Sequence, residues 1–222
     1  ALIPNFKGAE LAQAAGLKNL TYVISVSESH NKANINRTHD QSFEELRRIR
    51  ESFPELQLCI GMATTFGCPF EGIPDLDKVL RFVERIRSCD VDTVYLADTI
   101  GIADPAQVRR TVKSIIERFP DTKMQVHIHD TRGMGLVNTL AAIEAGVDTV
   151  QSTLGGLGGC PFAPGASGNT ATEDLVYMLQ RMGYDTGIDF DRLLALSKEQ
   201  HAEIDGIYSG HQMNIAAKSP CC

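Results

Sequence analysis

The chain has 222 residues, of which 43% are hydrophobic and 22% are charged, and it carries a net charge of -7. These values are typical of a globular domain that buries its own core. The acidic balance argues against a nucleic-acid-binding surface, and no apolar run approaches the roughly 20 residues of a membrane helix. Six cysteines are too few for a disulfide scaffold. We therefore expect a reduced, intracellular protein with neither nucleic acid nor membrane as a partner.

Short apolar runs alternate along the chain with amphipathic stretches. The runs predict strands at Ala1–Asn5, Leu20–Ser25, Leu56–Met62, Thr93–Ala97, Met124–His129 and Thr149–Thr153. The stretches predict helices at Phe6–Ala15, Gln41–Ser52, Leu76–Arg87, Pro105–Phe119, Asn138–Ala145 and Ala171–Met182. This alternation predicts an α/β fold with a parallel sheet, which is either an open doubly wound sheet or a (β/α)8 barrel. From about residue 187 we expect a helical and then polar C-terminal extension.

The predicted units number six, two fewer than a (β/α)8 barrel requires. The chain also opens directly in a predicted strand at Ala1. We therefore expect one catalytic barrel domain over residues 1–222 whose first two units are missing. The outer strands of such a sheet would be exposed apolar edges, which favour aggregation or domain swapping.

Polar residues gather where the predicted strands end, the rim on which barrel enzymes carry their active sites. His127 and His129 lie two apart in one predicted strand, so their side chains share a face. Two neighbouring imidazoles begin a metal site, although partly solvated histidines at a strand end would give the same pattern. Asp98 ends the preceding strand and favours the metal interpretation. His30, which follows the second strand, is a further candidate.

A glycine-rich loop extends from Gly155 to Asn169 and contains Cys160. It matches neither the dinucleotide-binding fingerprint nor the P-loop. A free cysteine is usually a small buried hydrophobe, but a thiol on a glycine-rich loop favours chemistry. The sequence Gly-Cys-Pro-Phe occurs both at Gly67–Phe70 and at Gly159–Phe162, each time after a strand. We expect the two loops to lie on one rim.

A resemblance to a known family is carried by six segments: Ser27–Asn36, Gly67–Gly72, Ala97–Gly101, Val126–Thr131, Gly156–Phe162 and Gly165–Tyr177. Together they resemble the 3-hydroxy-3-methylglutaryl-CoA (HMG-CoA) lyases, a family of metal-dependent TIM-barrel enzymes. The resemblance extends from Ala1 to about Leu196. Isopropylmalate and citramalate synthases share the His-x-His-Asp strand but not the Gly-Leu-Gly-Gly-Cys-Pro loop.

The resemblance implies roles for particular residues. It implies that Mg²⁺ or Mn²⁺ is bound by His127, His129 and Asn169. It implies that the catalytic residues are Cys160, His127 and Asp98. We expect the acyl-CoA substrate to be bound by Ser27, Asn5 and Glu71.

The family's first strand carries an Arg-Asp pair followed by Gln, in which the Asp is a fourth metal ligand and the Arg contacts substrate. This pattern does not occur in the 222 residues. We expect it to lie upstream of Ala1, and we expect the chain as given to lack lyase activity without it.

The reaction that the resemblance implies is a retro-Claisen cleavage of HMG-CoA to acetyl-CoA and acetoacetate, as in leucine degradation and ketone body metabolism. The cation would act as a Lewis acid, and Cys160 would protonate the acetyl-CoA enolate. The alternatives are a lyase for a bulkier 3-hydroxyglutaryl-CoA homologue, a Claisen-condensing synthase of the same barrel group, and an inactive truncated paralogue. We expect a homo-oligomer in the cytoplasm, or in mitochondria if a transit peptide precedes the chain.

Overall fold

The structure is a computed structural model that describes residues 1–159, 161–162 and 168–215. Within these residues, strands form one parallel sheet in the order β1-β2-β3-β4-β5-β6. The strands are β1 (Leu2–Ile3), β2 (Asn19–Ser25), β3 (Gln57–Ala63), β4 (Thr93–Asp98), β5 (Met124–Ile128) and β6 (Thr149–Gln151). Sequential neighbours paired in parallel are the pattern of βα units, as predicted.

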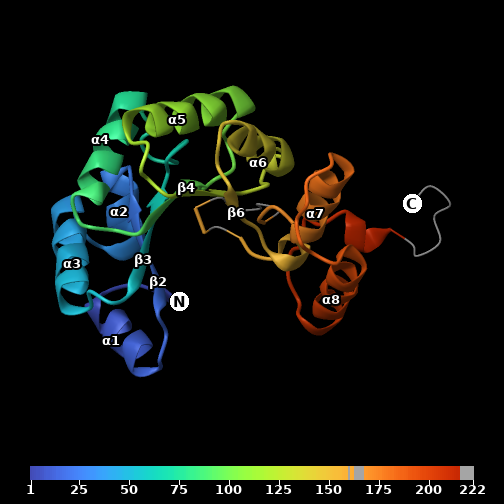
Figure 1. Cartoon of the computed structure of the whole chain (residues 1–222), viewed down its shortest axis with the longest axis horizontal. Helices are drawn as coiled ribbons and strands as arrows, with labels where there is room; N and C mark the ends of the chain where they lie inside the picture. Colours follow the sequence, from blue (N-terminus) through green and yellow to red (C-terminus); the bar gives the residue numbers. More distant parts are fainter. Residues whose placement is uncertain (160, 163–167, 216–222) are drawn as a thin grey trace.

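Helices connect the strands and continue after β6 (Figure 1). The connecting helices are α1 (Phe6–Ala14), α2 (Glu28–Ile35), α3 (His39–Ser52), α4 (Leu76–Arg87), α5 (Pro105–Arg118) and α6 (Gly135–Glu144). After β6 come a short 3₁₀ helix η1 (Leu154–Gly156), α7 (Thr172–Arg181), α8 (Phe190–Glu203) and a second 3₁₀ helix η2 (Gln212–Asn214). No helix in the described part of the chain has the length and apolarity to cross a membrane.

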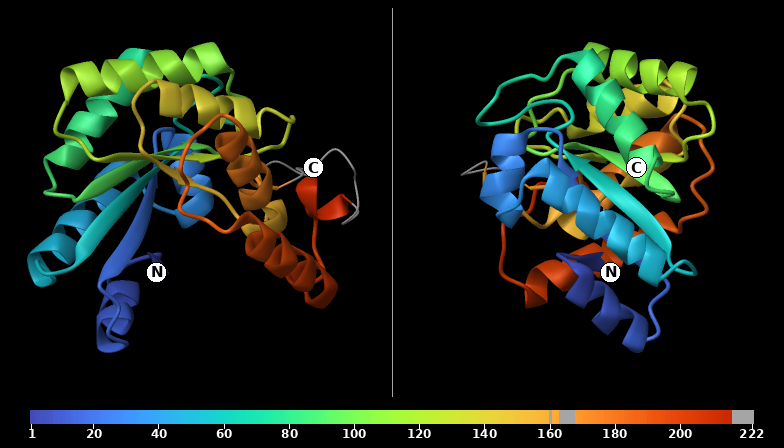
Figure 2. Two further views of the ribbon diagram at one scale, coloured as in Figure 1. Left: turned by 45° about the vertical axis from the view of Figure 1, so that its right-hand side comes forward. Right: turned by 90° about the vertical axis from the view of Figure 1, so that its left-hand side faces the viewer.

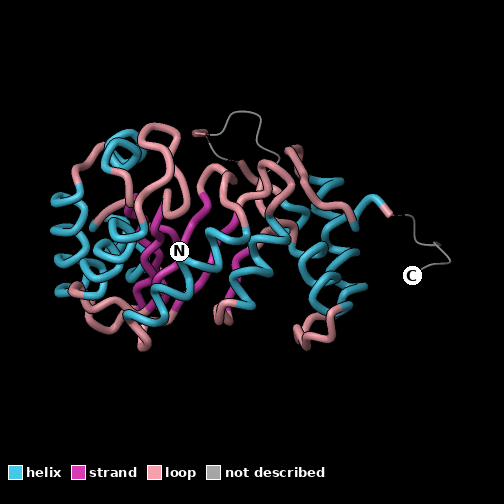
Figure 3. Tube along the Cα trace, turned by 90° about the horizontal axis from the view of Figure 1, so that it is seen from above, coloured by secondary structure: helices cyan, strands magenta, loops and turns pink. Residues whose placement is uncertain are grey.

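The core lies between the helices and one face of the sheet. In β2, Leu20, Tyr22 and Ile24 alternate with less buried residues and are almost fully buried, which is the period of a strand with one covered face. The apolar stripes of α3, α4 and α5 pack against that face. Viewed from above, the strands run side by side and the helices surround them (Figure 3).

The sheet is curved and open. Among the described residues, β1 pairs only with β2 and β6 only with β5. The curvature places α1 at one end of the fold and α7 and α8 at the other (Figure 2). The architecture is therefore six consecutive units of a (β/α)8 barrel, as the sequence predicted, with two open edges.

Local capping explains where several elements begin. Asp104 accepts a hydrogen bond from the backbone N–H of Gln107 at 2.9 Å, and Pro105 occupies the first turn of α5. Asn5 does the same for α1, accepting from the N–H of Gly8 at 3.0 Å, so β1 is shorter than the predicted Ala1–Asn5. Helix α2 was not predicted, because its sequence is polar and lacks an amphipathic period.

Gly61 allows the closest packing inside the sheet's concave face. A Cβ atom at this position would lie 2.2 Å from the Cζ atom of Tyr95, its partner on β4. We expect Gly61→Ala to lower the free energy of unfolding by about 1–3 kcal/mol, as overpacking does in cores. Urea unfolding measures this, with Gly159→Ala as control, because no described atom lies within 4 Å of a Cβ at Gly159. Equal stability of the two variants would contradict the packing account, and Tyr95→Leu is expected to restore part of the loss in Gly61→Ala.

Candidate active site

The side chains of His127 and His129 meet at the end of β5. Their Nε2 atoms are 3.1 Å apart, and the ring centroids are separated by 5.0 Å. Both imidazoles therefore point the same way, as strand alternation predicted. His127 pairs with Ala97 on β4 and Gln151 on β6, so its ring lies on the concave face among these neighbours.

Both imidazoles favour the neutral form. Burial lowers the pKa of His127, and a hydrogen bond with Gln151 partly opposes this shift. Burial also lowers the pKa of His129, to about 4, with a further contribution from the charge of protonated His127. Neutral imidazoles are the form that binds metal ions.

Asn169 supplies an oxygen beside this pair. It forms an antiparallel bridge with His129, and its side-chain amide donates to the carbonyl of Leu157 at 3.1 Å. The Oδ1 atom is buried and has no hydrogen-bond partner among the described residues, like Nδ1 of His129. A buried acceptor without a partner is costly unless a ligand satisfies it.

These donors fit a divalent cation. Two ligand atoms at adjacent corners of an octahedral ion, each about 2.1 Å from it, lie about 3 Å apart, close to the 3.1 Å between the two histidine nitrogens. Imidazole nitrogens with an amide oxygen suit Mn²⁺ or Mg²⁺. No group of three His, Cys, Asp or Glu side chains that could hold a metal occurs within the described ranges. The third candidate ligand is therefore the side-chain amide of Asn169.

Two glutamines lie beneath His127, and neither was predicted from the sequence. Gln151 contacts His127, and its Nε2 atom donates to Oε1 of Gln125 at 2.8 Å. Gln125 lies two residues before His127 and pairs with Tyr95 in the sheet, so the same alternation could have placed it on this face. A polar pair beneath a histidine fixes the ring's orientation.

Asp98 ends β4 but does not meet the histidines. It pairs with Ile128 rather than with His127, which places it on the opposite face of the sheet. Its two carboxylate oxygens accept hydrogen bonds from the N–H groups of Ile102 and Ala103, at 3.0 and 3.1 Å. Burial raises the pKa of Asp98, and these backbone hydrogen bonds oppose the shift. Asp98 therefore shapes the β4–α5 loop.

The three residues expected to bind substrate lie in two places. Ser27 and Glu71 share a hydrogen bond and line a cavity of about 180 Å³ with Cys68 and Lys78, after β2 and β3. Glu71 also accepts from Lys78 at 2.8 Å, and its hydrogen bonds lower its pKa to about 2 although burial opposes them. Asn5 lies apart from this cavity and caps α1.

The two Gly-Cys-Pro-Phe segments meet, as predicted. The rings of Phe70 and Phe162 are 6.0 Å apart and nearly perpendicular, and Phe162 lies 4.3 Å from the ring of His30. His30 is buried, with Nδ1 2.8 Å from the hydroxyl of Ser25. Cys160 itself lies outside the described residues.

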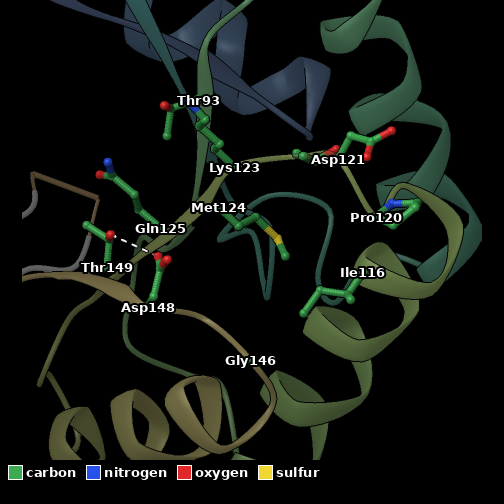
Figure 4. Close-up of a pocket in the computed structure, with 11 residues that line it drawn as sticks. Thr93, Ile116, Pro120, Asp121, Lys123, Met124, Gln125, Gly146, Asp148 and Thr149 are labelled. Carbon is green, nitrogen blue, oxygen red and sulfur yellow. Dashed lines mark hydrogen bonds between the residues drawn. The ribbon is translucent and has the colours of Figure 1, made fainter.

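A larger cavity lies at the other end of the strands. It measures about 530 Å³ and is lined by residues at the start of β4, β5 and β6, among them Thr93, Met124 and Thr149 (Figure 4). Residues at this end of a (β/α)8 barrel serve stability rather than catalysis. The histidine pair at the opposite end is therefore the candidate active site.

Comparison with known proteins identifies the family of the chain. The HMGL-like family model matches residues 1–199. The chain is 38% identical over 200 residues to the hydroxymethylglutaryl-CoA lyase YngG of Bacillus subtilis, covering 89% of this chain and 67% of that protein. It is 41% identical over 199 residues to the (R)-citramalyl-CoA lyase of Chloroflexus aurantiacus, covering 89% of this chain and 63% of that one.

A solved structure shows the same fold. An HMG-CoA lyase from Acinetobacter baumannii, in complex with coenzyme A and 3-methylmalate, superposes with a TM-score of 0.88 at 42% identity. The match covers 98% of this chain and 74% of that one. The chain thus spans about two thirds of the length of these relatives, and the family match extends over most of its own residues. The chain belongs to the HMGL-like family.

Proposed function

We propose that the protein is a divalent-cation-dependent lyase that cleaves HMG-CoA into acetyl-CoA and acetoacetate. One observation carries the proposal: the Nε2 atoms of His127 and His129 converge to 3.1 Å at the strand ends of a chain that belongs to the HMGL-like family. The unpartnered Oδ1 of Asn169 beside them adds a third ligand of the right kind.

His127, His129 and Asn169 would hold the cation. When bound, Mg²⁺ or Mn²⁺ supplies Lewis-acid polarisation of substrate oxygens. The low pKa values of the two histidines keep them unprotonated at neutral pH. The Gln151–Gln125 pair keeps the His127 ring in place.

Cleavage needs a base and an acid. A base removes the proton of the 3-hydroxyl group, the bond between C2 and C3 breaks, and its electron pair forms the enolate of acetyl-CoA. The proton passes to a base from solvent, because a neutral imidazole whose Nε2 atom faces the ion already carries a hydrogen on Nδ1, which leaves His127 no lone pair to accept another. Cys160 then donates a proton to C2, a role suited to a thiol with a pKa near 8.5.

The remaining residues act around the reacting atoms. Asp98 positions the β4–α5 loop through the backbone N–H groups that it accepts. Glu71 is negatively charged over the whole neutral range and would accept hydrogen bonds from the amide N–H groups of the pantetheine arm. Ser27, hydrogen-bonded to Glu71, lies on the same wall.

A second candidate substrate is citramalyl-CoA. The relative of that name is 41% identical to this chain, comparable to the 38% of the HMG-CoA lyase. The two acyl groups share the 3-hydroxy-3-methyl centre and differ by one methylene in the carboxylate arm. Breaking the corresponding bond in citramalyl-CoA yields pyruvate in place of acetoacetate.

The test is a product assay with both thioesters in Mg²⁺. Because the six strands form an open sheet, the assay is run on this chain alone and with the remaining third of the Bacillus subtilis lyase supplied. We expect acetyl-CoA and acetoacetate from HMG-CoA in the completed barrel, lost on addition of EDTA. If citramalyl-CoA yields pyruvate while HMG-CoA is not cleaved, the substrate is citramalyl-CoA. Cleavage of neither thioester by a completed barrel that binds Mn²⁺ would contradict the proposed function.

A further inference from the structure

The C-terminal segment Tyr208–Gln212 folds back onto the loop that bears Asn169. The hydroxyl of Ser209 donates to the backbone carbonyl of Asn169 at 2.7 Å, across 40 residues of sequence. The next residue, Gly210, donates its N–H to the carbonyl of Gly155 at 3.0 Å. The part of the chain beyond the barrel units therefore reaches the candidate metal ligand directly.

Hydrogen bonds fix Asn169 on three sides. Its N–H donates to the carbonyl of Gly156 at 3.1 Å, its carbonyl accepts from Ser209, and its side-chain amide donates to Leu157. These contacts give every polar group of Asn169 a hydrogen-bond partner except Oδ1. The amide is thus held with its oxygen turned away from its own loop, which is the orientation that a cation ligand needs.

Two glycines make the contacts this close. Gly156 has a φ of +70°, and a Cβ there would lie 1.8 Å from Oγ of Ser209 and 2.9 Å from the carbonyl oxygen of Asn169. Gly158 has a φ of +123°, and a Cβ there would lie 2.6 Å from Nδ2 of Asn169. Both conformations favour glycine, so the loop and the C-terminal segment are shaped around Asn169.

Two buried carboxylates at the start of α7 hold the glycine-rich loop and the C-terminal segment Tyr208–Gln212. Glu173 is fully buried and accepts from the N–H of Gly155 at 3.0 Å and the hydroxyl of Ser197 at 2.7 Å. Asp174 accepts the N–H groups of His211 and Gln212, each at 2.8 Å. Carboxylates bury only when hydrogen bonds compensate them, so these contacts hold the loop and the segment to one helix.

We propose that Ser209 is a positioning residue for the divalent cation: its hydroxyl holds the backbone of Asn169, and thereby sets the place of the Oδ1 ligand. The proposal rests on the proposed function, because it takes Asn169 as a ligand. It gives the described part of the C-terminal extension a role in the site that is not the role of a ligand.

The test is a Mn²⁺ titration followed by electron paramagnetic resonance, on the whole chain without substrate. We expect Ser209→Ala to weaken Mn²⁺ binding about tenfold, the lower range for residues that orient metal ligands, without loss of cooperative unfolding. Ser209→Thr keeps the hydroxyl and is expected to bind within about twofold of the wild type. Ser88→Ala is the matched control, because among the described residues the hydroxyl of Ser88 bonds only to the carbonyl of Arg85, at the exposed end of α4.

The outcomes separate this inference from the proposed function. Wild-type Mn²⁺ affinity in a folded Ser209→Ala variant would overturn the positioning role of Ser209 without contradicting the metal site. Mn²⁺ binding that is unchanged in His129→Ala, or absent from the wild type, would overturn the metal site and the positioning role with it. If Ser209→Ala fails to unfold cooperatively, Ser209→Gly, which also lacks the hydroxyl, is measured in its place, and affinity equal to the wild type again overturns the inference.

Discussion

Replacing either His127 or His129 with alanine is expected to abolish metal binding and with it lyase activity. Outer-shell partners of a metal ligand typically change affinity by about 10- to 100-fold, so loss of a direct ligand is expected to cost more than about 100-fold. Calorimetry with Mn²⁺ measures the affinity. Thermal unfolding gives a second readout, because an ion at 100 times its Kd stabilises the folded state by about 2.7 kcal/mol, and the variants should lose this gain.

His201→Ala serves as the control for the two histidine variants. His201 is exposed on α8 and contacts Tyr208 edge to face, with ring centroids 4.6 Å apart. We expect it to bind Mn²⁺ with wild-type affinity. Equal Mn²⁺ affinity in the His129→Ala and His201→Ala variants would mean that the histidine pair on β5 is not the metal site.

Cys160→Ser is expected to lower kcat by at least about 100-fold in the completed barrel, the low end of what a general acid contributes. A serine hydroxyl is a far weaker acid than a thiol, so protonation of the acetyl-CoA enolate would be slower. Cys59→Ser is the matched control, since Cys59 lies on β3 and has no assigned role. Wild-type kcat in the Cys160→Ser enzyme would remove Cys160 from the mechanism.

Alkylation distinguishes the same two thiols without an activity assay. Burial raises the pKa of Cys59 to about 11, so little thiolate is present at pH 8. A thiol with the ordinary pKa near 8.5 has roughly two hundred times more thiolate at that pH. Mass spectrometry after brief iodoacetamide treatment should therefore find Cys160 modified well before Cys59, and slower modification when substrate is bound.

Much of the fold follows from sequence periodicity. The alternation of β2 and the amphipathic spacing of α4 are local signals, and both elements occur within a residue of their predicted bounds. Helix α2 has no such signal. It is held by its N-cap at Ser27 and by the buried side chain of Asn31, which donates to the hydroxyl of Ser42 at 2.9 Å. Such tertiary hydrogen bonds leave no periodic trace in the sequence.

The candidate site divides in the same way. Strand alternation was enough to bring His127 and His129 together. It was not enough to place Asp98, which the sequence grouped with them. The register pairs Ala97 with His127, so Asp98 lies on the opposite face of the sheet. The link between Ser209 and Asn169 joins segments 40 residues apart, and only the folded chain reveals it.

A crystal grown with Mn²⁺ tests the account most directly, through an anomalous difference map collected at the manganese edge. We predict one manganese peak within about 2.0–2.3 Å of Nε2 of His127, Nε2 of His129 and Oδ1 of Asn169, the usual range for such ligands. A manganese ion bound elsewhere, with the two histidine nitrogens still facing each other at hydrogen-bond distance, would contradict the account.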